Sequence, residues 1–381
     1  MVNHNIFASF TFKNGTKLNN RIAMCPMLVF ASEENGSPSS ADLAYFERRN
    51  QFGGLLITGA ATISPQIKCT PNQLSFENDD QIPAFSQLAQ TMQANGSKAV
   101  VQLQHPGREA AVGYLECGKA YAPSKIDFPF LNHSVEELTH EQILAIIEDF
   151  GQATKRLIEA GFDGVEIHGA NHYLLQQFFS AYSNRRTDQW GGSLEKRMSF
   201  PLAVTKKVIE VARQEKPDFI VGYRLSPEEV HGENIGYVID DTLQLIDQLA
   251  ALDLGYIHTS TYGGGDFGKL AYKLLARAGN QSAPINQLVK ETINGRTALI
   301  VSGSIRSAAE AEDALNYGDI VGMGVPALAD PDFTLKIAAG KEDELNFNIK
   351  DRAEDLKLPP GLIAAYQNGA PFPILEGVDE I

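Results

Sequence analysis

A histidine and an asparagine stand three positions apart where an apolar, β-rich run of the sequence ends. His168 and Asn171 can both donate a hydrogen bond to one oxygen atom, so the pair could polarise a carbonyl or nitro group and stabilise a developing enolate. Tyr173 follows two positions later and could deliver a proton. Two interpretations compete: a purely structural histidine, or a metal pair formed by His168 and His172. Because that metal pair needs a helix and a third ligand, and the run is typical of a strand, we expect no metal here.

Two more polar side chains lie at the ends of apolar runs. Gln102 can both donate and accept hydrogen bonds, which suits the edge of a heterocyclic ring. Arg224 lies within an apolar run, where a guanidinium is costly unless it meets an anion or an electron-rich ring. The alternative for Arg224 is an internal salt bridge with Glu166.

The elements that must position these side chains alternate between β-rich runs and helical patterns. Eight near-continuous apolar runs are predicted as strands at 21–28, 54–63, 98–104, 163–169, 219–226, 255–261, 297–303 and 319–325. Helical patterns lie at 40–51, 82–95, 140–160, 194–214, 238–252, 284–294 and 307–317, with another after 330. This alternation predicts an α/β fold, the (β/α)8 TIM barrel, whose chemistry lies at the C-terminal ends of the strands. A doubly wound sheet competes, but it would prefer a G-x-G-x-x-G turn, and none follows an early strand.

Glycine-containing turns follow the last two predicted strands. Gly303 and Ser304 precede a helix expected to begin after Ser307, and backbone N–H groups at such a helix start can bind a phosphate. Gly324 ends the next strand. Either turn alone could be ordinary turn chemistry, but barrels frequently hold phosphate after strands seven and eight, so together they indicate a phosphate site.

The barrel is predicted to span residues 1–345 as a single domain without a linker. Residues 105–138 are too long for a simple connection after the third strand, so we expect a lid or a hairpin within the barrel domain. Residues 346–381 are rich in proline and are expected to form an irregular tail that packs on the barrel.

The composition excludes several classes of protein. The 381 residues carry 32 Lys and Arg against 47 Asp and Glu, a net charge of −15, which argues against a nucleic-acid partner. No apolar run reaches the roughly 20 residues of a membrane helix, and the N-terminus lacks the pattern of a signal peptide. The three cysteines, Cys25, Cys69 and Cys117, have no metal or cluster spacing. We therefore expect a cytoplasmic protein with neither a nucleic-acid nor a membrane partner.

Whole motifs of the chain resemble the Old Yellow Enzyme family of FMN-dependent NAD(P)H oxidoreductases over roughly residues 5–340. The shared stretches are Asn20-Arg21-Ile22 through Pro26-Met27, Gln102…His105-x-Gly107-Arg108, His168-x-x-Asn171-x-Tyr173-Leu174, Ser183-Asn184-x-Arg186-Thr187-Asp188-x-x-Gly191-Gly192-Ser193 and Arg224-Leu225-Ser226. The run at 183–193 is the most specific string, although no chemical role is assigned to it.

The resemblance implies a barrel that holds FMN noncovalently and uses NADH or NADPH as its electron donor. The flavin N5 would then give hydride to the β-carbon of a small electrophilic partner, an α,β-unsaturated carbonyl or nitro compound. His168 and Asn171 would bind the electron-withdrawing oxygen, and Tyr173 would be the proton donor. The implied flavin-ring contacts are Pro26, Met27, Ala60, Gln102 and Arg224. The implied phosphate contacts are Gly303, Ser304 and Gly324. A homo-oligomer is left open.

Three places depart from the family's pattern. Leu28 stands where a threonine or cysteine usually reaches the flavin C4 oxygen, so the reduced ring should be less stabilised. Val325 replaces an arginine that usually grips the phosphate, which leaves backbone N–H groups, helped by Arg306 or another cation. The acidic loop 227–233 is either solvated or repels anions such as the extra phosphate of NADPH, and we expect NADH to be favoured.

Two other functions compete with the flavin enzyme. A phosphate-binding isomerase or aldolase would need a Schiff-base lysine on a barrel strand, and Lys98 lies at a strand start, away from the chemistry. A barrel that has lost its flavin and serves as a binding or sensing protein would explain Leu28 and Val325. It would not explain the retained polar residues, since an idle site needs none of them.

Overall fold

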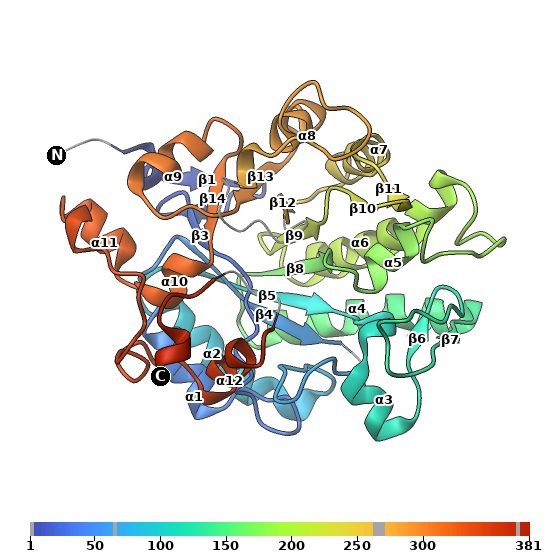
Figure 1. The fold of residues 1–381 in the computed structure, drawn as a ribbon, viewed down its shortest axis with the longest axis horizontal. Helices are drawn as coiled ribbons and strands as arrows, with labels where there is room; N and C mark the ends of the chain where they lie inside the picture. Colours follow the sequence, from blue (N-terminus) through green and yellow to red (C-terminus); the bar gives the residue numbers. More distant parts are fainter. Residues whose placement is uncertain (1–3, 64–66, 262–270, 371–373) are drawn as a thin grey trace.

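Eight parallel strands close into a barrel in the computed structural model, which describes residues 4–63, 67–261, 271–370 and 374–381 (Figure 1). In order of pairing they are β3 (Ile22–Met24), β4 (Leu55–Thr62), β5 (Lys98–Gln104), β8 (Gly164–Gly169), β9 (Ile220–Leu225), β12 (Tyr256–Thr259), β13 (Ala298–Ser302) and β14 (Ile320–Met323). Each predicted run contains one of these strands, and β14 pairs with β3 to close the ring. The predicted TIM barrel is therefore confirmed.

Helices follow the strands and cover the outside of the barrel (Figure 1). The predicted helices correspond to α1 (Ser40–Glu47), α2 (Ile82–Gln93), α4 (His140–Glu159), α6 (Leu194–Glu215), α7 (Ile239–Ala250), α8 (Ile285–Ile293), α9 (Ala308–Ala314) and α11 (Phe333–Ala338). Four short helices were not predicted: α3 (Ala111–Cys117), α5 (Leu174–Phe179), α10 (Val325–Ala329) and α12 (Pro360–Gln367). No helix of the described ranges combines the length and apolar character needed to cross a membrane.

The N-terminal half of the barrel interior is an apolar core. Every second residue of a strand faces inward, and the apolar inward set is Leu55, Ile57, Val100, Ile220, Tyr256, Ala298, Ile300 and Ile320. Phe12 and Leu18 join this cluster from the hairpin of β1 (Phe10–Thr11) and β2 (Lys17–Leu18). Burying each large apolar side chain contributes about 1.5–3 kcal/mol to the free energy of folding. This end of the barrel therefore stabilises the fold.

The interior becomes polar toward the C-terminal ends of the strands. Two positions beyond Val100, Gln102 faces inward and lies opposite Ala60 on β4 and Glu166 on β8. Two positions beyond Glu166, His168 lies opposite Arg224 on β9. The alternation of inward side chains thus brings the predicted site residues of three strands into one region.

The C-terminal segment is held against the barrel. Leu356, Leu358 and Leu362 are buried and belong to the main hydrophobic core. Arg49 follows the C-terminal end of α1 and is fully buried. Its Nη2 donates to Leu328 O (3.2 Å) and Leu356 O (2.9 Å). Burial, with Tyr45 on α1 as a smaller cause, raises the pKa of Tyr366 on α12, so these two helices lie close together (Figure 1).

The insertion after β5 is not a hairpin, which corrects one of the two expectations for 105–138. Its two short strands, β6 (Tyr121–Ala122) and β7 (Glu136–Glu137), pair in parallel, whereas hairpin strands are antiparallel. A parallel pair needs a long crossover between its strands, and residues 123–135 provide it. The α3 helix precedes this pair.

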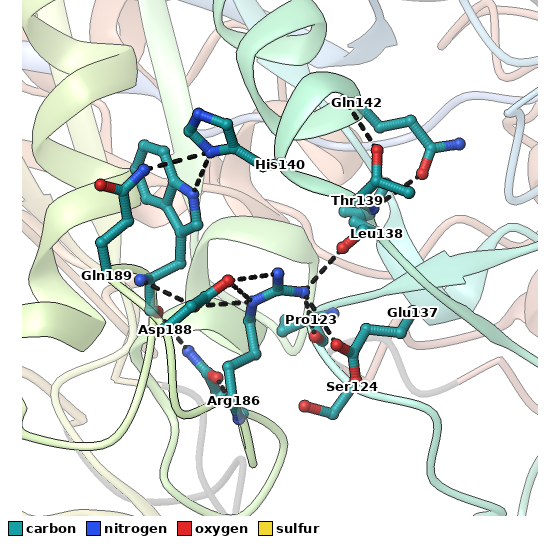
Figure 2. Close-up of polar contacts among 12 residues, drawn as sticks. Pro123, Ser124, Glu137, Leu138, Thr139, His140, Gln142, Arg186, Asp188 and Gln189 are labelled. Carbon is teal, nitrogen blue, oxygen red and sulfur yellow. Dashed lines mark hydrogen bonds and ion pairs between the residues drawn. The ribbon is translucent and has the colours of Figure 1, made fainter.

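Arg186 joins the insertion to the barrel, and this explains the specific run at 183–193 (Figure 2). The buried guanidinium donates to Pro123 O (3.0 Å) and Leu138 O (2.7 Å), one carbonyl beyond each short strand. Asp188 fixes its orientation with a contact of 2.6 Å between Nη2 and Oδ2. A second anchor, Arg108 Nη1 to Ser183 Oγ (2.5 Å), ties the start of the insertion to the same run. The motif is a structural clamp.

Replacing Arg186 with glutamine is expected to lower the free energy of unfolding by about 2–4 kcal/mol, because two buried carbonyls lose their donor. Urea unfolding would measure this, and limited proteolysis should show faster cleavage within 105–138. The control is Arg185→Gln, because Arg185 is exposed and its Nε bonds only Tyr182 O. Equal stability of the two variants would contradict the clamp.

Candidate active site

His168 and Asn171 lie together at the C-terminal end of β8. His168 faces the interior and is 3 % exposed. The chain then adopts a positive φ of 55° at Asn171. Asn171 N donates to Ser226 Oγ (3.0 Å), and Asn171 Oδ1 accepts from Ser260 Oγ (3.1 Å). Since Oδ1 is the acceptor in that bond, Nδ2 is the side-chain atom that can donate to a ligand.

Arg224 reaches the same region from β9. It is only half-buried although its strand neighbours are buried, and its Nη2 donates to Ser260 Oγ (3.3 Å). Its Nε is buried and has no hydrogen-bond partner within the described residues. The alternative salt bridge with Glu166 is wrong, because the Glu166 oxygens bond Gln102 Nε2 (2.7 Å) and His258 Nδ1 (2.9 Å) instead.

Ser260 connects Arg224 to Asn171 and was not predicted. Its hydroxyl accepts from Arg224 and donates to Asn171, so one side chain orients both. Its place directly after β12 was the available signal, since strand ends carry the chemistry in this fold. A serine at a strand end is too common for that signal to single it out.

Tyr173 lies beside His168, with ring centroids 5.1 Å apart in an edge-on arrangement. Gln104 and Cys69, two residues that sequence reasoning missed, lie close enough to its phenol to influence its pKa. Burial raises the pKa of Tyr173 well above its usual value, so the phenol keeps its proton. Gln104 Oε1 in turn accepts from Gln73 Nε2 (2.8 Å). The site thus holds a protonated acid next to two hydrogen-bond donors.

The imidazole of His168 is neutral. Burial, with the nearby charge of Arg224 as a smaller cause, lowers the pKa of His168 to about 3. The ring therefore donates through a single N–H at neutral pH. Its Nδ1 is buried and unpartnered within the described structure, so the ring is arranged for a partner outside the chain.

A second neutral histidine should make the fold acid-sensitive. Burial lowers the pKa of His105 to about 3, and its Nδ1 accepts from Gly107 N (3.0 Å). Between about pH 6.5 and pH 3 the unfolded chain binds a proton that the folded chain does not, so stability falls with decreasing pH by up to about 1.4 kcal/mol per pH unit. His105→Gln keeps an acceptor for Gly107 and removes the titration. The variant should therefore gain stability relative to wild type between pH 7 and pH 4.5 in urea unfolding. A stability difference that is the same at both pH values would contradict this assignment.

The segment after β3 lines the same end of the barrel. Pro26, Met27 and Leu28 are half-buried, whereas Cys25 is buried. Burial raises the pKa of Cys25 to about 11, so it remains a thiol. The segment passes so close to β4 that a Cβ on Gly59 would lie 2.4 Å from Met27 O, and only glycine fits there.

The predicted phosphate turns are present, with φ of 127° at Gly303 and 58° at Ser304. Gly324 precedes α10, which begins at Val325. Gly303, Ser304, Gly324 and Val325 are all half-buried. Gly303, Ser304 and Gly324 stay predictions as phosphate contacts.

The first turn of α9 does not offer the amides that were expected to bind phosphate. Ala308 N donates to Glu342 Oε1 (2.8 Å), and Glu310 N donates to Ser307 Oγ. Arg306, the suggested cation, forms an ion pair with Glu376 Oε1 (2.9 Å) in the C-terminal segment. Two amides of this first turn and the Arg306 guanidinium are therefore engaged within the chain.

The acidic loop after β9 forms a hairpin of β10 (Glu229–His231) and β11 (Asn234–Tyr237). Glu228 pairs with Arg277 (2.7 Å). Glu229 is buried and accepts from Gln176 Nε2 (2.9 Å) and Ser180 Oγ (2.7 Å). Because Glu228 is paired with Arg277 and Glu229 is buried, the loop gives little support to the predicted repulsion of anions.

His172 contacts this hairpin from the turn after β8. Its Nδ1 lies 3.7 Å from Glu229 Oε2, and its ring centroid lies 5.1 Å from that of His231. Within the described ranges, no three His, Cys, Asp or Glu side chains gather as metal ligands.

Comparison with known proteins decides the family. The model of the NADH:flavin oxidoreductase / NADH oxidase family matches residues 5–344. The chain belongs to this family. It is 41 % identical over 366 residues to the probable NADH-dependent flavin oxidoreductase YqiG of Bacillus subtilis, covering 95 % of this chain and 96 % of that protein. It is 38 % identical to the NADH:acrylate oxidoreductase of Vibrio harveyi, covering 92 % of this chain and 35 % of that longer protein.

Solved structures agree with this membership in the NADH:flavin oxidoreductase family. Morphinone reductase in complex with tetrahydroNAD superposes with a TM-score of 0.73 at 27 % identity, over 90 % of this chain and 92 % of that chain. An Old Yellow Enzyme homologue from Zymomonas mobilis has the same fold at 22 % identity and a TM-score of 0.73, over 88 % of this chain and 93 % of that chain. The Old Yellow Enzyme resemblance is thereby confirmed.

The residues present fit the flavin that membership in this family implies. Arg224 Nε and His168 Nδ1 are buried polar atoms without partners in the described structure, and both lie at the C-terminal end of the barrel. A guanidinium suits the electron-rich end of a flavin ring. The half-buried Pro26 and Met27 and the glycine turns lie at the ends of neighbouring strands. Pro26, Met27, Ala60, Gln102 and Arg224 would hold the ring.

Proposed function

We propose that the protein is an FMN-dependent NAD(P)H oxidoreductase of the ene-reductase type, acting on α,β-unsaturated carbonyl or nitro compounds. One observation carries this proposal. Two donors, His168 and Asn171, and the protonated phenol of Tyr173 lie together at the end of β8, and His168 is opposite Arg224 on β9. Such a set binds an electron-withdrawing oxygen and supplies a proton to the neighbouring carbon.

The chain's own residues divide the work. His168 and Asn171 bind the substrate oxygen and stabilise the negative charge that develops on it. Tyr173 Oη gives its proton to the α-carbon, and the side chains of Gln104 and Cys69 lie beside the phenol. Ser260 keeps the Asn171 amide turned so that Nδ2 faces the substrate. FMN, when bound, supplies the hydride chemistry, with reducing equivalents from NADH or NADPH.

The names of relatives support NADH as the donor, as in the probable NADH-dependent flavin oxidoreductase of Bacillus subtilis. The acrylate and fumarate named for two longer relatives are themselves activated alkenes, which supports the substrate class. The proposal includes a small electrophilic substrate, action in the cytoplasm, and no nucleic-acid or membrane partner.

The test is the visible absorption spectrum of the purified protein during anaerobic titration with NADH. Flavin bands that bleach with NADH and return when a cyclic enone or nitroalkene is added support the proposal. A protein that remains colourless after incubation with FMN would contradict it and favour a flavin-free binding barrel. Bleaching without reoxidation by any activated alkene would retain the flavin enzyme but reject the substrate class.

A further inference from the structure

A buried carboxylate lies beneath the proposed flavin site, and the proposed reaction does not use it. Glu166 faces the barrel interior from β8 and is 0 % exposed. Its Oε1 accepts from Gln102 Nε2 (2.7 Å), and its Oε2 accepts from His258 Nδ1 (2.9 Å). Burying a carboxylate is costly, so the presence of the Glu166 carboxylate inside the barrel needs an explanation.

Glu166 carries its negative charge in the folded protein. Both of its partners donate to it, and the hydrogen bonds from His258 and Gln102, with the positive charge of Arg224, hold its pKa below the usual value despite the opposing effect of burial. His258 does not cancel this charge. Its Nε2 is buried without a partner among the described residues, so a doubly protonated ring would bury an unpaired N–H.

The nearby titratable groups leave a single pair of opposite charges. Burial lowers the pKa of His258 and raises that of Cys25 to about 11, so both are neutral. The Tyr256 phenol has a pKa raised well above its usual value and is also neutral. Glu166 and Arg224 are therefore the two charged groups of this layer in the described structure.

Strand register places Glu166 directly beside the proposed ring contacts. Gln102 lies opposite Glu166 on β5, and Arg224 lies two positions beyond Gly222, which is opposite Glu166 on β9. The carboxylate thus fixes the amide of Gln102 from one side and opposes the positive field of Arg224 from the other.

We infer that Glu166 is a positioning residue whose charge makes the bound flavin harder to reduce and so keeps the reduced flavin a strong hydride donor. Gln102 and His258 hold its carboxylate in place. The inference rests on the proposed flavin binding. Leu28 acts in the same direction, since it offers no hydrogen bond to the ring. The fold would then balance Arg224, which binds a reduced and negatively charged ring, against a carboxylate that limits its stabilisation.

The test compares the flavin midpoint potential and the sulfite affinity of three proteins carrying FMN. Sulfite adds its lone pair to flavin N5 and leaves a negative charge on the ring, so its affinity reports charge stabilisation without any turnover. Glu166→Gln removes the charge and keeps the shape. The new amide accepts from Gln102 and donates to His258 Nδ1, so the ring proton moves to Nε2, which is unpartnered among the described residues. We expect its sulfite Kd to fall about tenfold, equivalent to about 1.4 kcal/mol, and its midpoint potential to rise.

His258→Gln is the matched control, because its amide can still donate to Glu166 while the carboxylate keeps its charge. We expect its sulfite Kd to stay within about twofold of wild type, below the 1.4 kcal/mol of a tenfold change. If Glu166→Gln fails to fold, Glu166→Met also removes the charge, at the cost of leaving Gln102 Nε2 and His258 Nδ1 without their acceptor. The same fall in Kd is expected.

Three outcomes would overturn the inference. Unchanged sulfite affinity in a charge-removing variant that binds FMN would show that the carboxylate does not act on the ring. An equal change in His258→Gln would show that loosening of Gln102, not charge, is responsible. A wild-type protein that takes up no FMN would reject the proposed function itself, and the inference with it.

Discussion

Replacing His168 with alanine is expected to slow the reoxidation of the reduced enzyme by a cyclic enone by about 10²–10³-fold, the typical loss when one donor to a developing oxyanion is removed. The neutral imidazole of His168 is one of two donors at this position, and Asn171 alone cannot replace it. The measurement is stopped-flow oxidation of prereduced protein, which separates this step from the reaction with NADH.

Two further expected results distinguish a role of His168 at the substrate from a general loss of activity. The His168→Ala protein should retain its flavin, since the proposed ring contacts are elsewhere. His231→Ala, at an exposed position on the neighbouring hairpin, should change the rate by less than an order of magnitude. A His168→Ala enzyme that oxidises at the wild-type rate would remove His168 from the substrate site and leave the proposed proton donor without its partner.

Arg224→Leu should produce a protein that loses most of its FMN during purification. The guanidinium is half-buried, bonds Ser260 through Nη2 and has an unpartnered Nε within the described residues, so it is arranged to meet a further group. A hydrogen bond to a charged group contributes about 1.5–3 kcal/mol, which corresponds to a loss of about 10–100-fold in affinity. Fluorescence titration of the apoprotein with FMN measures this affinity.

Arg213→Leu is a suitable control for this variant. Arg213 pairs with Asp253 on the outside of the barrel, so its loss should leave FMN affinity within about twofold, well under the 1.4 kcal/mol of a tenfold change. If Arg224→Leu bound FMN as tightly as wild type, Arg224 would serve only the internal polar network.

The barrel was predictable because its signal is repeated and local. Eight apolar runs separated by helical periods have few architectures open to them, and every run contained a strand. The same alternation placed His168 and Arg224 at one end of the barrel. Their register depends on strand pairing, so the sequence could indicate that they lie near each other but not that they lie opposite.

The polar contacts of the site were harder to predict, because they join residues that are far apart in the chain. Arg224 was weighed as a partner for Glu166, yet Glu166 bonds His258, 92 positions away. Ser260 and Gln104 belong to no distinctive sequence motif. Only the residues that they contact in the structure identify them as part of the site. The acidic loop shows the same limit, since its charge is visible in the sequence but the pairing of Glu228 with Arg277 is not.

The Arg186 clamp also makes the insertion a module that can be exchanged. Arg186 and Ser183 hold residues 105–138 at Arg108, Pro123 and Leu138. If two family members exchanged this insertion, the barrel strands of each protein would keep their own sequence. A grafted segment must present two backbone carbonyls and one guanidinium at those points, and must also keep the contacts of residues 105–108 with Leu174 and Gln177. Chimaeras built between family members at these joints would alter the insertion without redesigning the barrel.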